Sequence, residues 1–93
     1  MKKVFVTRRL LQSNEKRMSE IWNAKLNSED KIYSQSELIE LSRDCDGILC
    51  SIIDKFDAET INKLSDKVKI ISNFAVGFGN IDIKAAKKKK ILL

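Results

Sequence analysis

Two glycines with one aromatic residue between them, Gly77 and Gly79, stand in the segment 70–83, IISNFAVGFGNIDI. Glycine allows backbone conformations that are closed to other residues, so successive N–H groups can turn toward one point and hold an anion. Loops at the carboxyl ends of parallel strands are also where α/β proteins bind ligands. The chemistry that this pattern indicates is recognition of a carboxylate or a phosphate.

Two other interpretations of this segment are open. GFGNID matches the start of the dinucleotide fingerprint GxGxxG, but the third glycine position is Asp82, whose carboxylate would repel a pyrophosphate. That fingerprint also follows the first strand of its domain, whereas this segment follows the fourth predicted strand. A glycine-rich turn that only reverses the chain fits the spacing equally well.

Other residue types that do chemistry are scarce. The chain has no histidine and two cysteines, Cys45 and Cys50, which lie among apolar neighbours. A cysteine pair without histidine is a poor metal site, so we expect both thiols to pack in the core. The opening residues MKKVFVTRRL lack the long apolar run of a signal peptide, which indicates a reduced, cytoplasmic location. No stretch is long enough to span a bilayer.

The elements that must position this chemistry follow from the alternation of short apolar runs with amphipathic segments, which is typical of parallel strands joined by helices. Strands are predicted at 3–7, 31–33, 48–50 and 68–72, and a fifth begins at 91–93. Helices are predicted at 13–26, after the capping-box pair Ser34 and Glu37, from the N-cap Asp57 to about Leu64, and after the N-cap Asp82.

The predicted elements form one small α/β domain. The apolar run at 48–50 has no polar alternation, which is typical of a central strand covered on both faces. The last predicted strand has nothing after it to cover it, which we interpret as truncation at or in the fifth strand. Apolar surface should then stay exposed, so we expect the chain to bind a hydrophobic dye or to self-associate.

Most of the formal net charge of +5 lies in one basic segment, residues 82–90, which holds five lysines against Asp82. This segment allows a function of another class, a non-enzymatic binding module of the same fold that contacts an acidic partner such as RNA. The lysines at 87–90 spread round all sides of a helix and no aromatic residue interleaves them. That spacing favours a solvated helix end with favourable C-terminal cations.

The run IISNFAVGFGNIDIKAAKKKKI resembles the strand, loop and helix of the D-isomer-specific 2-hydroxyacid dehydrogenases, especially glyoxylate and hydroxypyruvate reductases, in which AVGxxNID followed by AA and a basic stretch is typical. KVFVTRRL is similar to the family's first strand, and DGILCSIIDKFDAETINKL resembles its third strand and following helix. The resemblance implies a flavodoxin-like fold, a parallel sheet with helices on both faces. Residues 1–93 would be part of the substrate-binding domain, and the nucleotide-binding domain would be absent from this chain.

The resemblance also implies site residues. The backbone N–H groups of Val76 and Gly77 would hold the carboxylate of a small 2-keto acid. Ser51, in the loop that follows the third strand, would be a polar contact in the same cleft; the alternative for Ser51 is a turn serine that bonds locally. Asn80 and Asp82 are expected to be structural, with Asn80 steadying the loop and Asp82 capping the helix.

Three more residues are expected near the cleft. Cys50 and Ile52 would line it beside Ser51, and Phe78 would pack against it or screen it. Arg8 and Arg9, which follow the first strand, are expected in a solvated loop. A receiver protein of this fold would need acidic residues at these strand ends instead.

The family reaction moves a hydride between NADH or NADPH and a keto carbon, with a histidine as acid–base group. This chain lacks both a histidine and a complete GxGxxG unit. We therefore expect it to be inactive alone and to bind neither nucleotide, nucleic acid nor membrane. The full-length enzyme is expected to be a homodimer that uses NAD or NADP on small 2-keto and 2-hydroxy acids.

Overall fold

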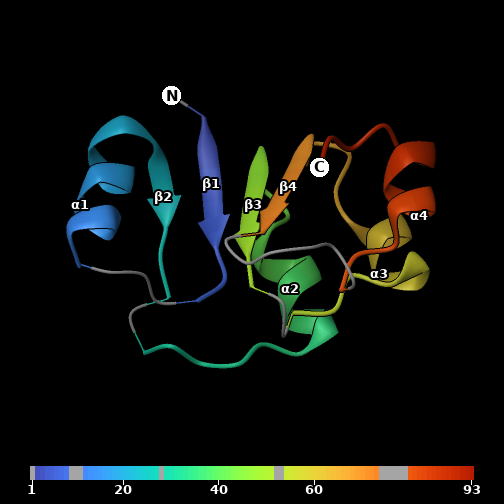
Figure 1. The fold of residues 1–93 in the computed structure, drawn as a ribbon, viewed down its shortest axis with the longest axis horizontal. Coiled ribbons are helices and arrows are strands. Elements are labelled where there is room, and N and C mark those ends of the chain that lie inside the picture. Colours follow the sequence, from blue (N-terminus) through green and yellow to red (C-terminus); the bar gives the residue numbers. More distant parts are fainter. Residues whose placement is uncertain (1, 9–11, 28, 52–53, 74–79) are drawn as a thin grey trace.

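The computed structural model describes residues 2–8, 12–27, 29–51, 54–73 and 80–93. In this described part, four parallel strands form one sheet in the order β2-β1-β3-β4. The strands are β1 (Lys3–Val6), β2 (Asn23–Lys25), β3 (Gly47–Cys50) and β4 (Ile70–Asn73). The helices are α1 (Gln12–Ile21), α2 (Gln35–Leu41), α3 (Ala58–Lys63) and α4 (Ile83–Lys88). Figure 1 shows the four strands side by side and pointing the same way.

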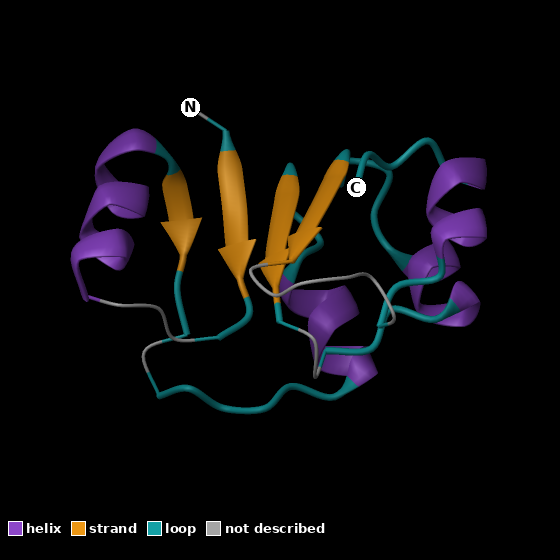
Figure 2. Cartoon of the chain, viewed as in Figure 1, coloured by secondary structure: helices purple, strands orange, loops and turns teal. Residues whose placement is uncertain are grey.

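The sheet confirms the predicted fold class. Its strand order is that of the first four strands of a flavodoxin-like sheet, and β3 is central, with β1 on one side and β4 on the other. Leu92 forms a parallel bridge with Ile70. Residues 91–93 therefore stand where a fifth strand would begin, as the sequence predicted. Helices and strands alternate along the chain (Figure 2).

The core lies between one face of the sheet and helices α2, α3 and α4. Side chains on alternate strand positions point to this face, and Phe5, Ile48 and Ile71 are buried there with residues of the three helices. Cys45 and Cys50 are also buried, as predicted. The strands β3 and β4 approach closely, because a Cβ atom added at Gly47 would lie 2.8 Å from Cγ2 of Ile70.

The predicted helix starts are confirmed. The Ser34 hydroxyl accepts from the backbone N–H of Glu37, whose carboxylate accepts from the N–H of Ser34, so α2 begins with a complete capping box. Asp57 accepts from the N–H of Thr60 at the start of α3. Asp82 accepts from the N–H of Ala85 at the start of α4. These bonds satisfy amide groups that have no partner inside the helix.

The second strand was predicted wrongly. It is Asn23–Lys25, whereas the predicted strand at 31–33 has no strand structure, and the first helix ends at Ile21 instead of near residue 26. One helical hydrogen bond continues beyond the end of α1, because the N–H of Trp22 donates to the carbonyl of Met18. The strand β2 is polar and lies at the edge of the sheet. It forms because it pairs with β1, and its own sequence has no apolar pattern that would predict a strand.

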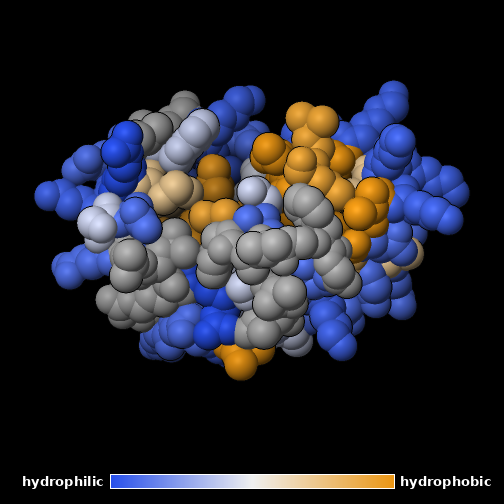
Figure 3. All heavy atoms as spheres, viewed as in Figure 1, coloured by the Kyte–Doolittle hydropathy of each residue, from blue (hydrophilic) through white to orange (hydrophobic). Residues whose placement is uncertain are grey.

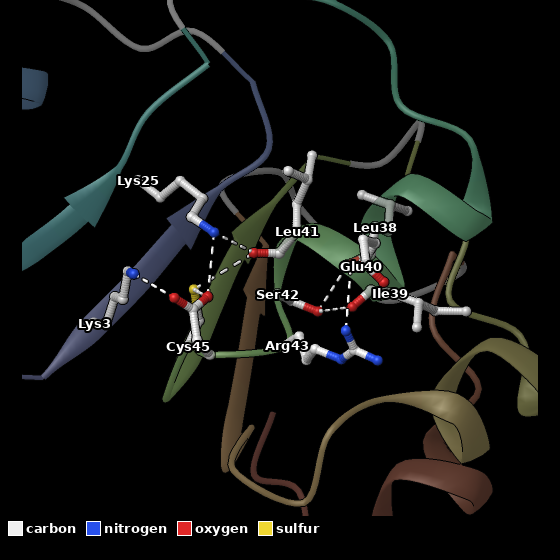
Figure 4. A network of polar contacts seen from close by, with 10 residues as sticks. Lys3, Lys25, Leu38, Ile39, Glu40, Leu41, Ser42, Arg43 and Cys45 are labelled. Carbon is white, nitrogen blue, oxygen red and sulfur yellow. Dashed lines mark hydrogen bonds and ion pairs between the residues drawn. The ribbon is translucent and has the colours of Figure 1, made fainter.

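A polar network at the amino end of β3 holds the edge of the sheet to the loop after α2 (Figure 4). Lys25 of β2 donates to the carbonyl of Leu41 at 2.8 Å and to the carboxylate of Asp44 at 3.2 Å. Lys3 of β1 forms a second ion pair with Asp44. The hydrogen bonds from these two lysines hold the pKa of the Asp44 carboxyl well below its usual range.

Candidate functional site

The candidate site lies where β1, β3 and β4 end. Because the strands are parallel, their carboxyl ends meet at one edge of the sheet, the lower edge in Figure 1. Six polar side chains from these ends and the following loops form what we call the strand-end cluster: Thr7, Cys50, Ser51, Asp54, Asn73 and Asn80.

Asp54 joins the end of β1 to the loop after β3. Its carboxylate is 1% exposed, and one oxygen, Oδ2, accepts from the hydroxyl of Thr7, from the N–H of Ser51 at 2.9 Å and from the hydroxyl of Ser51 at 3.2 Å. The other oxygen, Oδ1, is buried and has no hydrogen-bond partner among the described residues. The three bonds accepted by Oδ2 hold the loop after β3 to the end of β1. Oδ1 can still accept a hydrogen bond from a further donor.

Asn80 joins the same loop to the segment that precedes α4. Its side-chain N–H group donates to the carbonyls of Ser51 at 3.0 Å and Asp54 at 2.8 Å. Its oxygen accepts from the Asn73 amide at 2.8 Å. The backbone carbonyl of Asn80 also accepts from the N–H of Phe56 at 2.8 Å. Asn80 thus steadies this region, the structural role that was predicted for it.

Cys50 is a structural thiol in the strand-end cluster. Its sulfur lies 3.1 Å from the side-chain oxygen of Asn73, to which it donates. Burial, with the negative charge of Asp54 adding to it, raises the pKa of the Cys50 thiol to about 12. The thiol therefore stays protonated at neutral pH, which makes it a poor nucleophile.

The structure places only some of the predicted site residues. Ser51 lies in the strand-end cluster, where it is 8% exposed and its hydroxyl donates to the carboxylate of Asp54. This local bond favours the alternative interpretation, in which Ser51 is a turn serine that bonds its neighbours. Val76 and Gly77, the predicted carboxylate-binding residues, lie outside the described residues, and so do Phe78 and Ile52.

Arg8 corrects one expectation. It is not simply solvated, because its guanidinium donates to both carboxylate oxygens of Asp30, at 2.8 and 2.9 Å, and its side chain is 22% exposed. This bidentate pair ties the end of β1 to the turn after β2. Arg9 lies outside the described residues.

Sequence reasoning missed Asp54, Thr7 and Asn73 as members of the site. Ser51 and Asp54 are three residues apart just after a buried strand, a spacing that allows the local side-chain to backbone bond observed here. That signal was available. The bond from Thr7 spans 47 positions and carries no local signal.

The basic segment is only partly a helix. Helix α4 ends at Lys88, and Lys90 has a positive φ of 63°. The ammonium of Lys89 donates to the carbonyls of Asn62 and Leu64 and lies 3.8 Å from a carboxylate oxygen of Asp66. One of the five lysines therefore caps α3 instead of facing a partner.

Replacement of Asn80 by aspartate tests the steadying role. A carboxylate cannot donate to the carbonyls of Ser51 and Asp54, so Asn80→Asp should lower the free energy of unfolding by about 2 kcal/mol. Denaturant unfolding followed by circular dichroism measures this change. Asn14→Asp, an equal charge change at an exposed position of α1, should stay within about 0.5 kcal/mol of the wild type. Equal effects of the two substitutions would contradict the role.

Comparison with known proteins supplies the family. Residues 4–93 match the model for the D-isomer specific 2-hydroxyacid dehydrogenase, catalytic domain. The chain belongs to the D-isomer-specific 2-hydroxyacid dehydrogenase family. It is 34% identical over 89 residues to a glyoxylate reductase of Thermococcus litoralis, a match that covers 96% of this chain and 27% of the relative. It is 28% identical over 90 residues to a glycerate dehydrogenase of Hyphomicrobium methylovorum, covering 97% of this chain and 28% of that relative.

Solved structures agree with this assignment. A Polaromonas sp. protein described as an NAD-binding D-isomer specific 2-hydroxyacid dehydrogenase superposes with a TM-score of 0.92 at 25% identity, over 98% of this chain and 28% of its own. An NAD⁺-bound 3-phosphoglycerate dehydrogenase of Entamoeba histolytica superposes with a TM-score of 0.77 at 30% identity, over 97% of this chain and 31% of its own. The chain thus spans little more than a quarter of the length of the curated relatives it matches.

Among the described residues, no helix has the length and apolar character needed to cross a membrane.

Proposed function

We propose that this chain is the first part of the substrate-binding domain of an NAD(P)-dependent enzyme that interconverts small 2-keto acids and D-2-hydroxy acids. Family membership supports the reaction class. The names of relatives, which include glyoxylate reductases and a glycerate dehydrogenase, support the size of the substrate. Within the proposal, the N–H groups of Val76 and Gly77 hold the substrate carboxylate, and Ser51 lies at the floor of the same cleft.

The observation that carries the proposal is the amide pair between Asn73 and Asn80. These two residues flank the segment 74–79, and the Asn73 amide donates to the Asn80 oxygen at 2.8 Å. Both ends of the segment are therefore held beside the loop that carries Ser51 and Asp54, at the edge of the sheet where α/β proteins bind ligands.

Substrate binding and hydride transfer belong to different parts of the proposed enzyme. Carboxylate binding needs only backbone amides, which this chain contains. Hydride transfer needs a nicotinamide and an acid–base group, and the chain has no histidine to act as that group. We therefore propose that the 93-residue chain binds a small 2-keto acid weakly and catalyses nothing by itself.

Titration of the ¹⁵N-labelled chain with glyoxylate, followed by NMR, tests the proposed site. The amide signals of Val76 and Gly77 should shift in a saturable way. Val76→Pro removes one N–H donor, whereas Val76→Ala keeps it. The loss of one charge-assisted hydrogen bond should weaken binding about tenfold or more in the proline variant and leave the alanine variant near the wild type.

Two results would contradict the proposal. Chloride, which has no carboxylate, could shift the same amides equally at the same ionic strength, which would make the loop a general anion site. Alternatively, the purified chain could oxidise NADH or NADPH with glyoxylate or hydroxypyruvate, and the expected absence of activity would be wrong.

A further inference from the structure

The carboxylate of Asp54 is a buried negative charge without a charged partner in the described part of the chain. Its Oδ2 atom accepts from the hydroxyl of Thr7 and from the N–H and the hydroxyl of Ser51, which are neutral groups. Its Oδ1 atom is buried and accepts from no described residue. A carboxylate taken out of water is costly unless a cation or a full set of donors offsets its charge. The charge of Asp54 is therefore not neutralised within the strand-end cluster.

The arginine that follows β1 does not supply the missing cation. The guanidinium of Arg8 donates to both carboxylate oxygens of Asp30, at 2.8 and 2.9 Å. These hydrogen bonds raise the pKa of Arg8, and the negative charges of Asp30 and Asp54 add to the effect. Arg8 is thus within electrostatic range of Asp54, but its charge is already paired with the carboxylate of Asp30.

The strand-end cluster also uses its side-chain donors internally. Thr7 and Ser51 donate to the carboxylate of Asp54. Asn80 donates to the backbone carbonyls of Ser51 and Asp54. A ligand group beside these residues would meet a negative charge and an acceptor oxygen that has no described partner. A neutral group that donates a hydrogen bond suits these surroundings, whereas a carboxylate or a phosphate does not.

The loop that carries Asp54 lies next to the proposed carboxylate site. Asn80 donates to the carbonyl of Asp54 at 2.8 Å, and the three residues from Gly77 to Asn80 span at most about 11 Å. Salt screens a buried charge much less than an exposed one. In Figure 3 the described side chains along the lower edge are mostly hydrophilic, whereas hydrophobic ones gather near the amino end of β4 and the C-terminus. The charge of Asp54 therefore acts on an anion held at this polar edge.

We propose that Asp54 is a specificity-determining residue, which limits the substrate to a 2-keto acid with a single negative charge. This inference rests on the proposed function, in which backbone N–H groups of the loop after β4 hold the substrate carboxylate. The charge of Asp54 opposes every anion. A second anionic group on the substrate has no cation or donor side chain among Thr7, Ser51 and Asn80 to offset the repulsion.

Oxaloacetate and its 4-amide, 2-oxosuccinamate, test this selectivity. The two compounds have nearly the same shape, but the amide has a neutral group in place of the second carboxylate. In titrations of the ¹⁵N-labelled chain at neutral pH, followed by NMR at Val76 and Gly77, the dissociation constant of the amide should be lower by about tenfold or more. Asp54→Asn removes the charge and keeps the side-chain shape, so it should reduce this ratio to about threefold or less.

Asp66→Asn is the matched control. It removes the same charge from an exposed side chain in the connection between α3 and β4, which enters β4 at its amino end, and it should leave the ratio unchanged. Circular dichroism establishes that both variants fold, and the comparison of the two ligands on the wild type stands without them.

Equal binding of the two ligands to the wild type overturns the role of Asp54, and so does a ratio that Asp54→Asn leaves intact or that Asp66→Asn lowers equally. Binding of glyoxylate alone overturns it as well, because size and not charge would then set the limit. In each of these cases the proposed function stands, since Val76 and Gly77 still respond to a keto acid. If glyoxylate and both ligands leave these amides unchanged, the proposed function fails and the role of Asp54 fails with it.

Discussion

Asp54→Ala should lower the free energy of unfolding by about 3 kcal/mol. The substitution removes the acceptor for the Thr7 hydroxyl and for the backbone N–H and the hydroxyl of Ser51, and all of these groups are buried. Buried donors without an acceptor are costly because they cannot return to water in the folded chain. Urea unfolding at neutral pH, followed by circular dichroism, measures the change.

Asp54→Asn is the matched control, because asparagine keeps the size and shape of the aspartate side chain and removes its charge. Its amide oxygen can take the place of Oδ2 and accept the same three bonds, while its NH₂ group replaces Oδ1, which has no partner in the described part of the chain. The loss should therefore be clearly smaller than for alanine, about 1 kcal/mol. An alanine variant as stable as the wild type would show that the Asp54 bonds contribute nothing, and the strand-end cluster would lose its central member.

The second large effect is alkaline destabilisation through Cys50. Burial disfavours the thiolate and raises the pKa of the Cys50 thiol from its ordinary value of 9.0, which holds in the unfolded chain, to about 12 in the folded chain. Between these values the unfolded chain has released the proton and the folded chain has kept it. The unfolded chain then binds fewer protons, so the free energy of unfolding should fall as pH rises, by up to about 1.4 kcal/mol per pH unit. Below pH 9 this contribution is fully present.

Cys50→Ser isolates this titration from the other groups that ionise at high pH. The serine hydroxyl can donate to Asn73 as the thiol does and does not ionise in this range. Urea unfolding of both proteins at intervals from pH 8 to pH 11 should show the wild type losing stability more steeply than the variant. Parallel curves would mean that Cys50 is not desolvated in the folded chain.

The sequence predicted most elements because their signals are local. A capping box such as Ser34 with Glu37 satisfies amides within one turn, so neighbouring residues suffice to indicate it. The run at Ile48–Leu49 indicated the central strand because a strand covered on both faces must be apolar at every position. The second strand was missed because Asn23–Lys25 is polar and its structure depends on pairing with Lys3–Phe5, which lies elsewhere in the chain.

By itself, the sequence determined the α/β class, the starts of three helices and the family resemblance, since each depends on residues close together in the chain. Only the tertiary structure showed that Thr7, Asp54 and Asn80 meet at one edge of the sheet. It also showed that Trp22 and Ile70 line the same groove. The physical reason is the parallel sheet, which brings strand ends and strand faces together across dozens of residues, where no spacing along the chain records which side chains meet.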